Sequence, residues 1–341
     1  MASYEQRLTE QLATFSALAG GGLPAAEEPV RPEPPFAPFT GYRLRSAPGV
    51  RDEGRRRGGV GGFFERIRPP EPESEPDLEE ALDFRPHPPG EIRVVRVHPE
   101  EHSALLARES AMRLLGSAAA LDGVLSFELL GLPDEVRVQW AAAKAEAEFL
   151  RGVARAHLGK ARVSLESDAL GETWQGLDAH VMEFRLESVV HFPLAAGGAD
   201  PMPALAAALG GLREGERALV QVLFEPARHP WAESLLRCVR HRDGTPVFED
   251  SSGLLQAAVR KTSSPMFAAV VRAAAAAEGK DRAAAILGRI AGCIGSVGGT
   301  NRLVRHTGGT PASWQDFLAR RSRRFGMLLN AEELATFTSP P

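Results

Sequence analysis

The chain has 341 residues, of which 43% are hydrophobic and 25% are charged, the proportions of a globular protein with room for two ordinary domains. Its 40 basic and 44 acidic side chains give a formal net charge of −4 at pH 7. This balance excludes a uniformly basic nucleic-acid-binding protein, but it leaves room for a local basic surface.

Cysteine content and the N-terminus indicate a cytoplasmic protein. Two cysteines, Cys238 and Cys293, cannot form a zinc site alone and provide no disulfide framework, so we expect a reduced compartment. The N-terminus is polar and lacks the apolar core of a signal peptide. No segment approaches the roughly 18 consecutive apolar residues needed to span a membrane.

Residues 1–19 contain a short amphipathic pattern, with Tyr4, Leu8, Leu12 and Phe15 at helical spacing. Residues 20–90 are rich in Pro, Gly and alternating charge, and such a composition buries too little apolar surface to offset the loss of chain entropy. We therefore predict a helix followed by a flexible linker. The helix is either a tethered docking element for a partner or a segment that packs on the chain's own core, and the pattern does not distinguish between these two interpretations.

Residues 91–170 have the pattern of one compact unit. Alternating or β-branched runs predict strands at 92–97, 124–130, 135–141 and 161–165. The first helix is predicted at 102–119, and the second ends near Gly159. The first helix carries an apolar stripe of Leu105, Ala111, Leu115 and Ala118, and the second has Ala145, Phe149, Val153 and Ala156 on one face. The resulting β-α-β-β-α-β order is that of a ferredoxin-like unit.

Residues 176–308 repeat this order. Strands are predicted at 182–190, 218–224, 266–273 and 301–304, and helices at 200–212 and 280–294, with Asp200 as the N-cap. An insertion at about 228–263 contains a helix at 231–239, and residues 309–341 form a C-terminal segment that is helical over 313–337. The fold class is therefore α+β, with two tandem ferredoxin-like βαββαβ units preceded by a helix and a Pro/Gly-rich linker.

The segment from His98 to His102 matches the H-x-x-E-H pattern of inverted zinc peptidases. Such a site requires both histidines on one face of a helix, with the glutamate as general base. Pro99 instead places His98 at the end of a strand or at a helix cap, and no third ligand is recognisable. A small metallohydrolase at His98, Glu101 and His102 is kept as an alternative. Cys238 and His241 are a weaker metal pattern still.

Nucleotide and acyl-transfer motifs do not occur in the sequence. It contains neither the G-x-x-x-x-G-K-[ST] loop that cradles phosphates nor the G-x-S-x-G nucleophile turn. The aromatic pattern of RNA-recognition domains is also missing, since the two central strands of the first unit carry only Phe127 and Trp140. We therefore predict no enzymatic activity, no cofactor and no resident metal.

Basic residues near the C-terminus form the best candidate for an interaction surface. The candidate residues are Arg302, Arg305, Arg320, Arg321, Arg323 and Arg324. They are suited to phosphate contacts with DNA, to contacts with an acidic protein surface, or to simple solvation.

Three segments resemble a known family. They are Asp200 to Leu212 with the following Gly215 to Leu223, then Arg260 to Arg272 with a K-x-x-x-P-x-F…R pattern, and finally Leu328 to Ala335. Together they resemble the pre-motor region of conjugative, type IV secretion DNA-transfer ATPases of the HerA/FtsK superfamily. The resemblance covers about residues 90–337 and rests on structural motifs, not catalytic ones.

The resemblance implies a role beside a motor. A domain with a phosphate-binding loop would follow in the family, whereas this sequence stops at Pro341, so we expect a stand-alone pre-motor subunit or one half of a split ATPase. The expected function is a non-catalytic adaptor that acts with a separately encoded ATPase in DNA transfer or defence. A DNA-binding module that uses the C-terminal arginines is the alternative, and homo-oligomerisation is left open.

Overall fold

The computed structural model describes most of the chain from Glu91 onward. The described residues are 91–98, 104–121, 123–159, 161–187, 193–194, 200–227, 231–241, 245, 252–298, 301–307, 312–322 and 326–341. The predicted N-terminal helix and linker lie outside these residues. Within them, the chain is a mixture of helices with an antiparallel sheet, in agreement with the expected α+β class.

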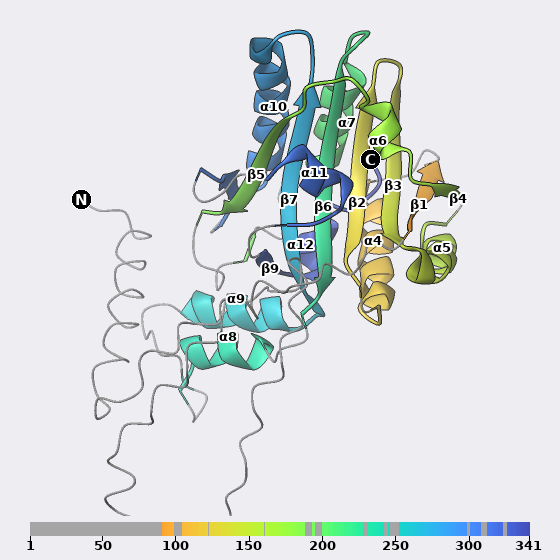
Figure 1. Cartoon of the computed structure of the whole chain (residues 1–341). Helices are drawn as coiled ribbons and strands as arrows, with labels where there is room; N and C mark the ends of the chain where they lie inside the picture. Colours follow the sequence, from red (N-terminus) through yellow and green to blue (C-terminus); the bar gives the residue numbers. More distant parts are fainter. Residues whose placement is uncertain are drawn as a thin grey trace, which may run out of the picture.

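Nine strands form one sheet in the described part of the chain (Figure 1). They are β1 (Ile92–His98), β2 (Leu125–Leu132), β3 (Glu135–Ala143), β4 (Arg162–Ser167), β5 (His180–Leu186), β6 (Arg217–Pro226), β7 (Met266–Ala276), β8 (Leu303–Arg305) and β9 (Met327–Asn330). Their order is β4-β1-β3-β2-β6-β7-β5-β8. Strand β9 pairs with Met266–Ala269 of β7, while β5 pairs with a later stretch of the same strand.

Strands β2 and β6 join the two halves of the sheet. They are paired without interruption from Leu125, opposite Phe224, to Gly131, opposite Ala218. One hydrophobic core extends across this seam, and its large side chains include an edge-to-face series of aromatic rings. The rings belong to Phe127, Trp140, Phe224 and Phe267. The apolar core is therefore shared by both halves.

Helices cover both faces of the sheet. The described helices are α4 (Ala104–Ala118), α5 (Lys144–His157), α6 (Leu170–Thr173), α7 (Met202–Gly210), α8 (Trp231–Val239), α9 (Ser252–Thr262), α10 (Lys280–Gly295), α11 (Trp314–Leu318) and α12 (Ala331–Ala335). Figure 1 shows α4, α7 and α10 behind the sheet and α6 and α11 in front of it. None of the described helices is both long and apolar enough to cross a bilayer.

Helix α5 lies on the sheet with a different face from the one its sequence suggests. The face that contains Ala145, Phe149 and Ala156 is exposed, whereas Ala147, Leu150 and Ala154 are buried. The helix carries two apolar stripes, and periodicity alone does not distinguish which of them faces the core. The inner stripe consists of small residues beside one leucine, which lets the helix lie close to β1, β3 and β4.

The C-terminal segment differs from the single helix expected over 313–337. It forms the short helix α11, the strand β9 and the short helix α12. Both helices begin with a capping box, made by Ser313 with Asp316 and by Asn330 with Glu333. The run Met327–Asn330 is too short for its periodicity to identify a strand, and it becomes one by pairing with β7. Helices α6 and α9 were also not predicted.

Candidate functional site

A row of polar side chains crosses the middle of the sheet on the face that α11 covers. Glu128 of β2 is paired with Gln139 of β3 and with Gln221 of β6, and Gln221 is paired with Arg272 of β7. Residues directly opposite each other on paired strands point to the same face. These four side chains are all buried, and they form a continuous polar line across the seam.

The carboxylate of Glu128 is saturated with donors. Its Oε1 accepts hydrogen bonds from Ser126 Oγ at 2.9 Å, Gln221 Nε2 at 2.7 Å and Arg320 Nε at 2.8 Å. Its Oε2 accepts from Gln139 Nε2 at 2.7 Å and from Arg320 Nη2 at 3.1 Å. Burial alone would raise the pKa of Glu128, but the Arg320 charge and these hydrogen bonds outweigh burial and lower the pKa. The carboxylate therefore stays ionised inside the protein.

Arg320 reaches this carboxylate from the loop after α11. Its backbone has a φ of 48°, the left-handed region that a non-glycine residue adopts at a cost. Its guanidinium also binds both carboxylate oxygens of Asp168, with Nη2 2.9 Å from Oδ1, and donates to the Leu318 carbonyl at 2.8 Å. Burial would lower the pKa of Arg320, but Glu128 and Asp168 raise it. Arg320 thus ties the C-terminal segment to β2 and to the end of β4.

Arg272 holds the other side of α11. It donates to Gln221 Oε1 at 2.7 Å, to the Arg321 carbonyl at 2.7 Å and to the Asp316 carbonyl at 2.8 Å, and it lies 4.1 Å from the centre of the Phe317 ring. Carbonyls at a helix C-terminus lack partners within the helix, and a cation is the favourable partner. Burial lowers the pKa of Arg272 to about 9, so the side chain is still charged at neutral pH. The polar row therefore holds α11 on the sheet, and its members form hydrogen bonds and ion pairs with one another.

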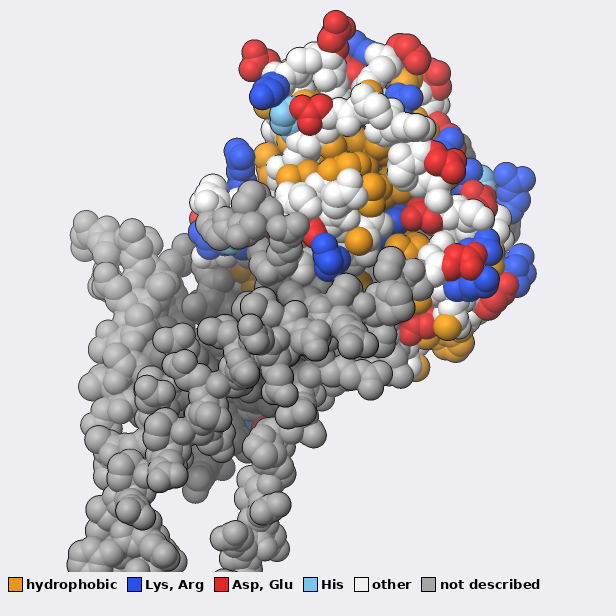
Figure 2. Space-filling view, in the orientation of Figure 1, with side chains coloured by type: hydrophobic (Ala, Val, Ile, Leu, Met, Phe, Trp, Pro, Cys, Tyr) orange, Lys and Arg blue, Asp and Glu red, His pale blue; other side chains and the backbone are white. Residues whose placement is uncertain are grey.

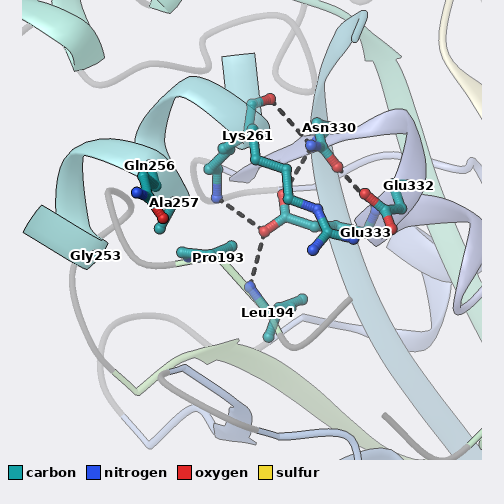
Figure 3. A pocket seen from close by; sticks show the side chains of 10 residues that line it. Pro193, Leu194, Gly253, Gln256, Ala257, Lys261, Asn330, Glu332 and Glu333 are labelled. Atoms are coloured by element: carbon teal, nitrogen blue, oxygen red, sulfur yellow. Dashed lines mark hydrogen bonds and ion pairs between the residues drawn. The ribbon is translucent and has the colours of Figure 1, made fainter. Parts of the chain in front are cut away.

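A second polar cluster joins α9 to β9 and α12 (Figure 3). Lys261 Nζ lies 3.2 Å from Glu333 Oε1, and their side chains are 0% and 1% exposed. The same oxygen accepts a hydrogen bond from the Leu194 amide at 2.8 Å, and Asn330 Nδ2 donates to the Lys261 carbonyl at 3.0 Å. Burial lowers the pKa of Lys261, and the carboxylate of Glu333 opposes this shift. The contacts fix the lysine as a structural partner of α12.

A half-open pocket of about 280 Å³ lies above this pair. Its lining comprises Pro193, Leu194, Gly253, Gln256, Ala257, Arg260, Lys261, Asn330, Glu332 and Glu333. At its rim Arg260 Nη2 lies 2.9 Å from Glu332 Oε1. Two cations and two carboxylates leave the pocket with no net charge, and the lining has no cysteine, serine or histidine. Its lysine and its carboxylates are held in the Lys261–Glu333 and Arg260–Glu332 ion pairs.

The structure distributes the candidate arginines over separate environments. Arg320 is buried in the ion pairs above, and Arg321 is paired with Asp316 at 3.0 Å. Arg302 is paired with Glu187 at 2.7 Å at the β8 edge, where Arg305 is exposed. Strands β6, β7 and β5 lie between that edge and β2, to which Arg320 is bound. Arg323 and Arg324 lie outside the described residues.

The remaining sequence candidates are only partly within the described chain. Strand β1 ends at His98, the position that Pro99 predicts, while Glu101 and His102 lie outside the described residues. Tyr4, Leu8, Leu12 and Phe15 also lie outside them. Among the residues that are described, no cluster of three or more His, Cys, Asp or Glu side chains is arranged to hold a metal ion.

The polar row was not predicted, although three of its four members leave a local signal. Glu128 interrupts the apolar run of β2, Gln221 that of β6 and Arg272 that of β7. A buried polar residue requires a partner. Three such interruptions at the centres of three strands therefore indicate a shared network, but only the strand register identifies the partners.

Comparison with known proteins gives no family assignment. No protein-family model matches the chain, and neither does any curated protein.

Proposed function

We propose that this chain is a non-catalytic interaction module that resembles the pre-motor part of a conjugation-type DNA-translocating ATPase. In this proposal it acts with an ATPase of the HerA/FtsK type in DNA transfer or defence. The observation that carries the proposal is that two of the family-like segments, residues 260–272 and 328–335, form one structural joint.

The joint is built from main-chain and side-chain contacts. Strand β7 pairs with β9 from Met266, opposite Asn330, onward, and the Ala331 amide donates to the Pro265 carbonyl at 2.9 Å. The buried Lys261–Glu333 pair closes the joint from α9. The residues that carry the resemblance are thus the residues that connect α9, β7, β9 and α12. Because their role is structural and not catalytic, the resemblance supports a binding module.

We also propose that the two halves are ferredoxin-like units. The first is β1-α4-β2-β3-α5-β4, and the second is β5-α7-β6-β7-α10-β8, with α8 and α9 inserted. The strand orders β4-β1-β3-β2 and β8-β5-β7-β6 are the same when each strand is numbered within its own unit. Shared element order and shared strand order both support two copies of one motif.

A partly exposed apolar area supports an interaction role. It lies on the face of the sheet that carries α11 and α6, and Figure 2 shows apolar side chains gathered there. Its members are Leu132, Leu177, Ala179, Val181, Trp314 and Leu318. Contiguous apolar surface with an aromatic centre is typical of protein-binding sites. We assign this area, the front apolar area, to contact with the motor.

Co-expression with a HerA/FtsK-type ATPase from the same genome tests the proposal. We expect the two proteins to co-purify, and Val181→Glu to weaken the complex at least about tenfold, since burying a charge in an apolar interface is costly. The matched control is Val259→Glu, which alters a valine that is 47% exposed on α9 and is expected to leave binding unchanged.

Two results would contradict the proposal. One is failure of the wild-type chain to bind the co-expressed ATPase, with both proteins folded by circular dichroism. The other is steady nucleotide hydrolysis by the purified chain, because the proposal leaves hydrolysis to the partner ATPase.

A further inference from the structure

Helix α5 presents an apolar stripe whose outer residues no described element covers. Ala145, Phe149 and Ala156 of this stripe are exposed, Phe149 by 48%, while Val153 lies half-buried at its border and also packs against the core. Among the described elements, α5 packs against α4, β1, β3 and β4, mainly with the opposite face that contains Ala147, Leu150 and Ala154. A phenylalanine half exposed in the middle of an apolar stripe marks a surface that gains stability when a second apolar element covers it.

The N-terminal segment carries an apolar stripe with the same spacing. Tyr4, Leu8, Leu12 and Phe15 are separated by four, four and three residues. The four residues on α5 are separated by the same intervals. Rows of side chains spaced by four residues form the ridges by which two helices interdigitate. The two stripes therefore match in length and in the positions of their side chains.

The tether between these segments favours an intramolecular contact. About 70 residues separate the N-terminal pattern from β1, and a flexible chain of that length has a root-mean-square reach of about 45 Å. Such a tether gives a local concentration on the order of millimolar. A single amphipathic helix of this length is marginally stable in water, so it requires an apolar surface to become ordered.

Gly152 makes close approach feasible. It is exposed on the outer face of α5, three residues after Phe149, and a Cβ built on it meets no atom within 4 Å. We propose that residues 3–18 dock as a helix on this outer face of α5, with Leu8 and Leu12 packed against Phe149 and Val153. The N-terminal helix is then an intramolecular cover of α5.

Photo-crosslinking in the full-length chain tests the docking. With p-benzoylphenylalanine in place of Phe149, we expect an intrachain crosslink that mass spectrometry locates within residues 3–18, with a yield independent of protein concentration. The matched control carries the photo-crosslinker in place of Val259 on α9, which is exposed to a similar extent, and should not crosslink to residues 3–18. A crosslink to residues 145–156 of a second copy, or equal yields from both positions, would overturn the proposal.

Substitutions on α5 and in the N-terminal segment distinguish a loss of docking from a loss of folding. Gly152→Arg fills the space on α5, and the double change Leu8→Asp with Leu12→Asp removes the apolar stripe of the other segment. Each should reduce the crosslink from position 149 at least about fivefold and leave the melting temperature within about 2 °C. Gly288→Arg on α10, where an added Cβ also meets open space, should leave the yield unchanged. Persistence of the crosslink in both docking variants would contradict the assignment.

Discussion

Glu128 and Arg320 form a buried ion pair in which each partner depends on the other. The carboxylate is fully buried and accepts from four side chains, and the guanidinium is shared with Asp168. Removing one partner of such a pair leaves an uncompensated charge in the interior, which costs about 3–5 kcal/mol. We therefore expect Arg320→Ala to lower the free energy of unfolding by this amount, as measured by urea denaturation.

The control for this prediction is an exposed ion pair of the same type. Arg302 binds Glu187 with side chains that are 55% and 44% exposed, and pairs of this kind contribute less than about 1 kcal/mol. Arg302→Ala should therefore have a small effect. If both variants lose similar stability, Arg320 does not hold the C-terminal segment. The comparison also bears on DNA binding, because an arginine held in this way is not available to a phosphate.

Glu216 makes stability depend on pH. Arg282 donates two hydrogen bonds to its carboxylate, at 2.6 and 2.9 Å, and these lower the pKa of Glu216 from 4.5 to about 2. Since the native state holds the carboxylate ionised, its contribution is complete above about pH 4.5 and is lost as the pH falls toward 2. Arg282 is partly exposed, so solvent screening limits the contribution to about 1–2 kcal/mol.

Urea unfolding at pH 7 and pH 3 measures this contribution. The difference in free energy of unfolding between the wild type and Glu216→Gln should be about 1–2 kcal/mol at pH 7 and clearly smaller at pH 3. The matched variant Glu109→Gln alters an exposed i,i+4 pair with Arg113, and it should show little dependence on pH. A Glu216→Gln difference that is equal at both pH values would contradict the role of this carboxylate.

At the scale of elements, Gly131 sets how closely α7 lies on β2. A Cβ at this position would stand 2.9 Å from the Leu209 carbonyl oxygen and 3.0 Å from the side chains of Leu209 and Leu212. Because part of this contact is backbone, the helix must shift to relieve it. We expect Gly131→Ala to destabilise the protein by about 1–3 kcal/mol in thermal or chemical denaturation.

A helical glycine with open space around it serves as the control, because its substitution should not destabilise the protein. Gly288 of α10 is exposed and has no neighbour within 4 Å of an added Cβ. Gly288→Ala should therefore be neutral or stabilising by up to about 1 kcal/mol, through helix propensity alone. Destabilisation by both substitutions would indicate that loss of glycine, and not overpacking between α7 and β2, is responsible.

The local sequence pattern predicted most strands of the sheet. It failed where tertiary contacts determine the secondary structure or the buried face of an element. Alternation identified β3 and β5, and the nearly continuous apolar run of residues 218–224 identified β6. The pattern did not identify β9, whose four residues become a strand through pairing with β7. It also favoured the wrong inner face of α5, because that helix carries two apolar stripes. The partners in the polar row depend on strand register, which no short sequence pattern specifies.

At the scale of the whole molecule, the seam between β2 and β6 predicts how the protein unfolds. Seven residue pairs join the strands, and one hydrophobic core contains side chains from both halves. The ion pairs of Arg320 with Glu128 and Asp168, and the hydrogen bonds of Arg272 to Gln221 Oε1 and the Arg321 carbonyl, connect the C-terminal segment to both sides of the seam. Separating the halves would expose apolar surface and leave buried charges without partners.

We therefore expect residues 91–341 of the full-length chain to unfold in a single cooperative transition. Far-UV circular dichroism and tryptophan fluorescence should give coincident urea transitions, because Trp140 lies in the first half and Trp314 in the C-terminal segment that clamps the second. Arg320→Ala should move both transitions together to lower urea concentration. Two separate transitions in the wild type would mean that each half is stable alone, and that the β2–β6 pairing and the polar row add too little free energy to couple them.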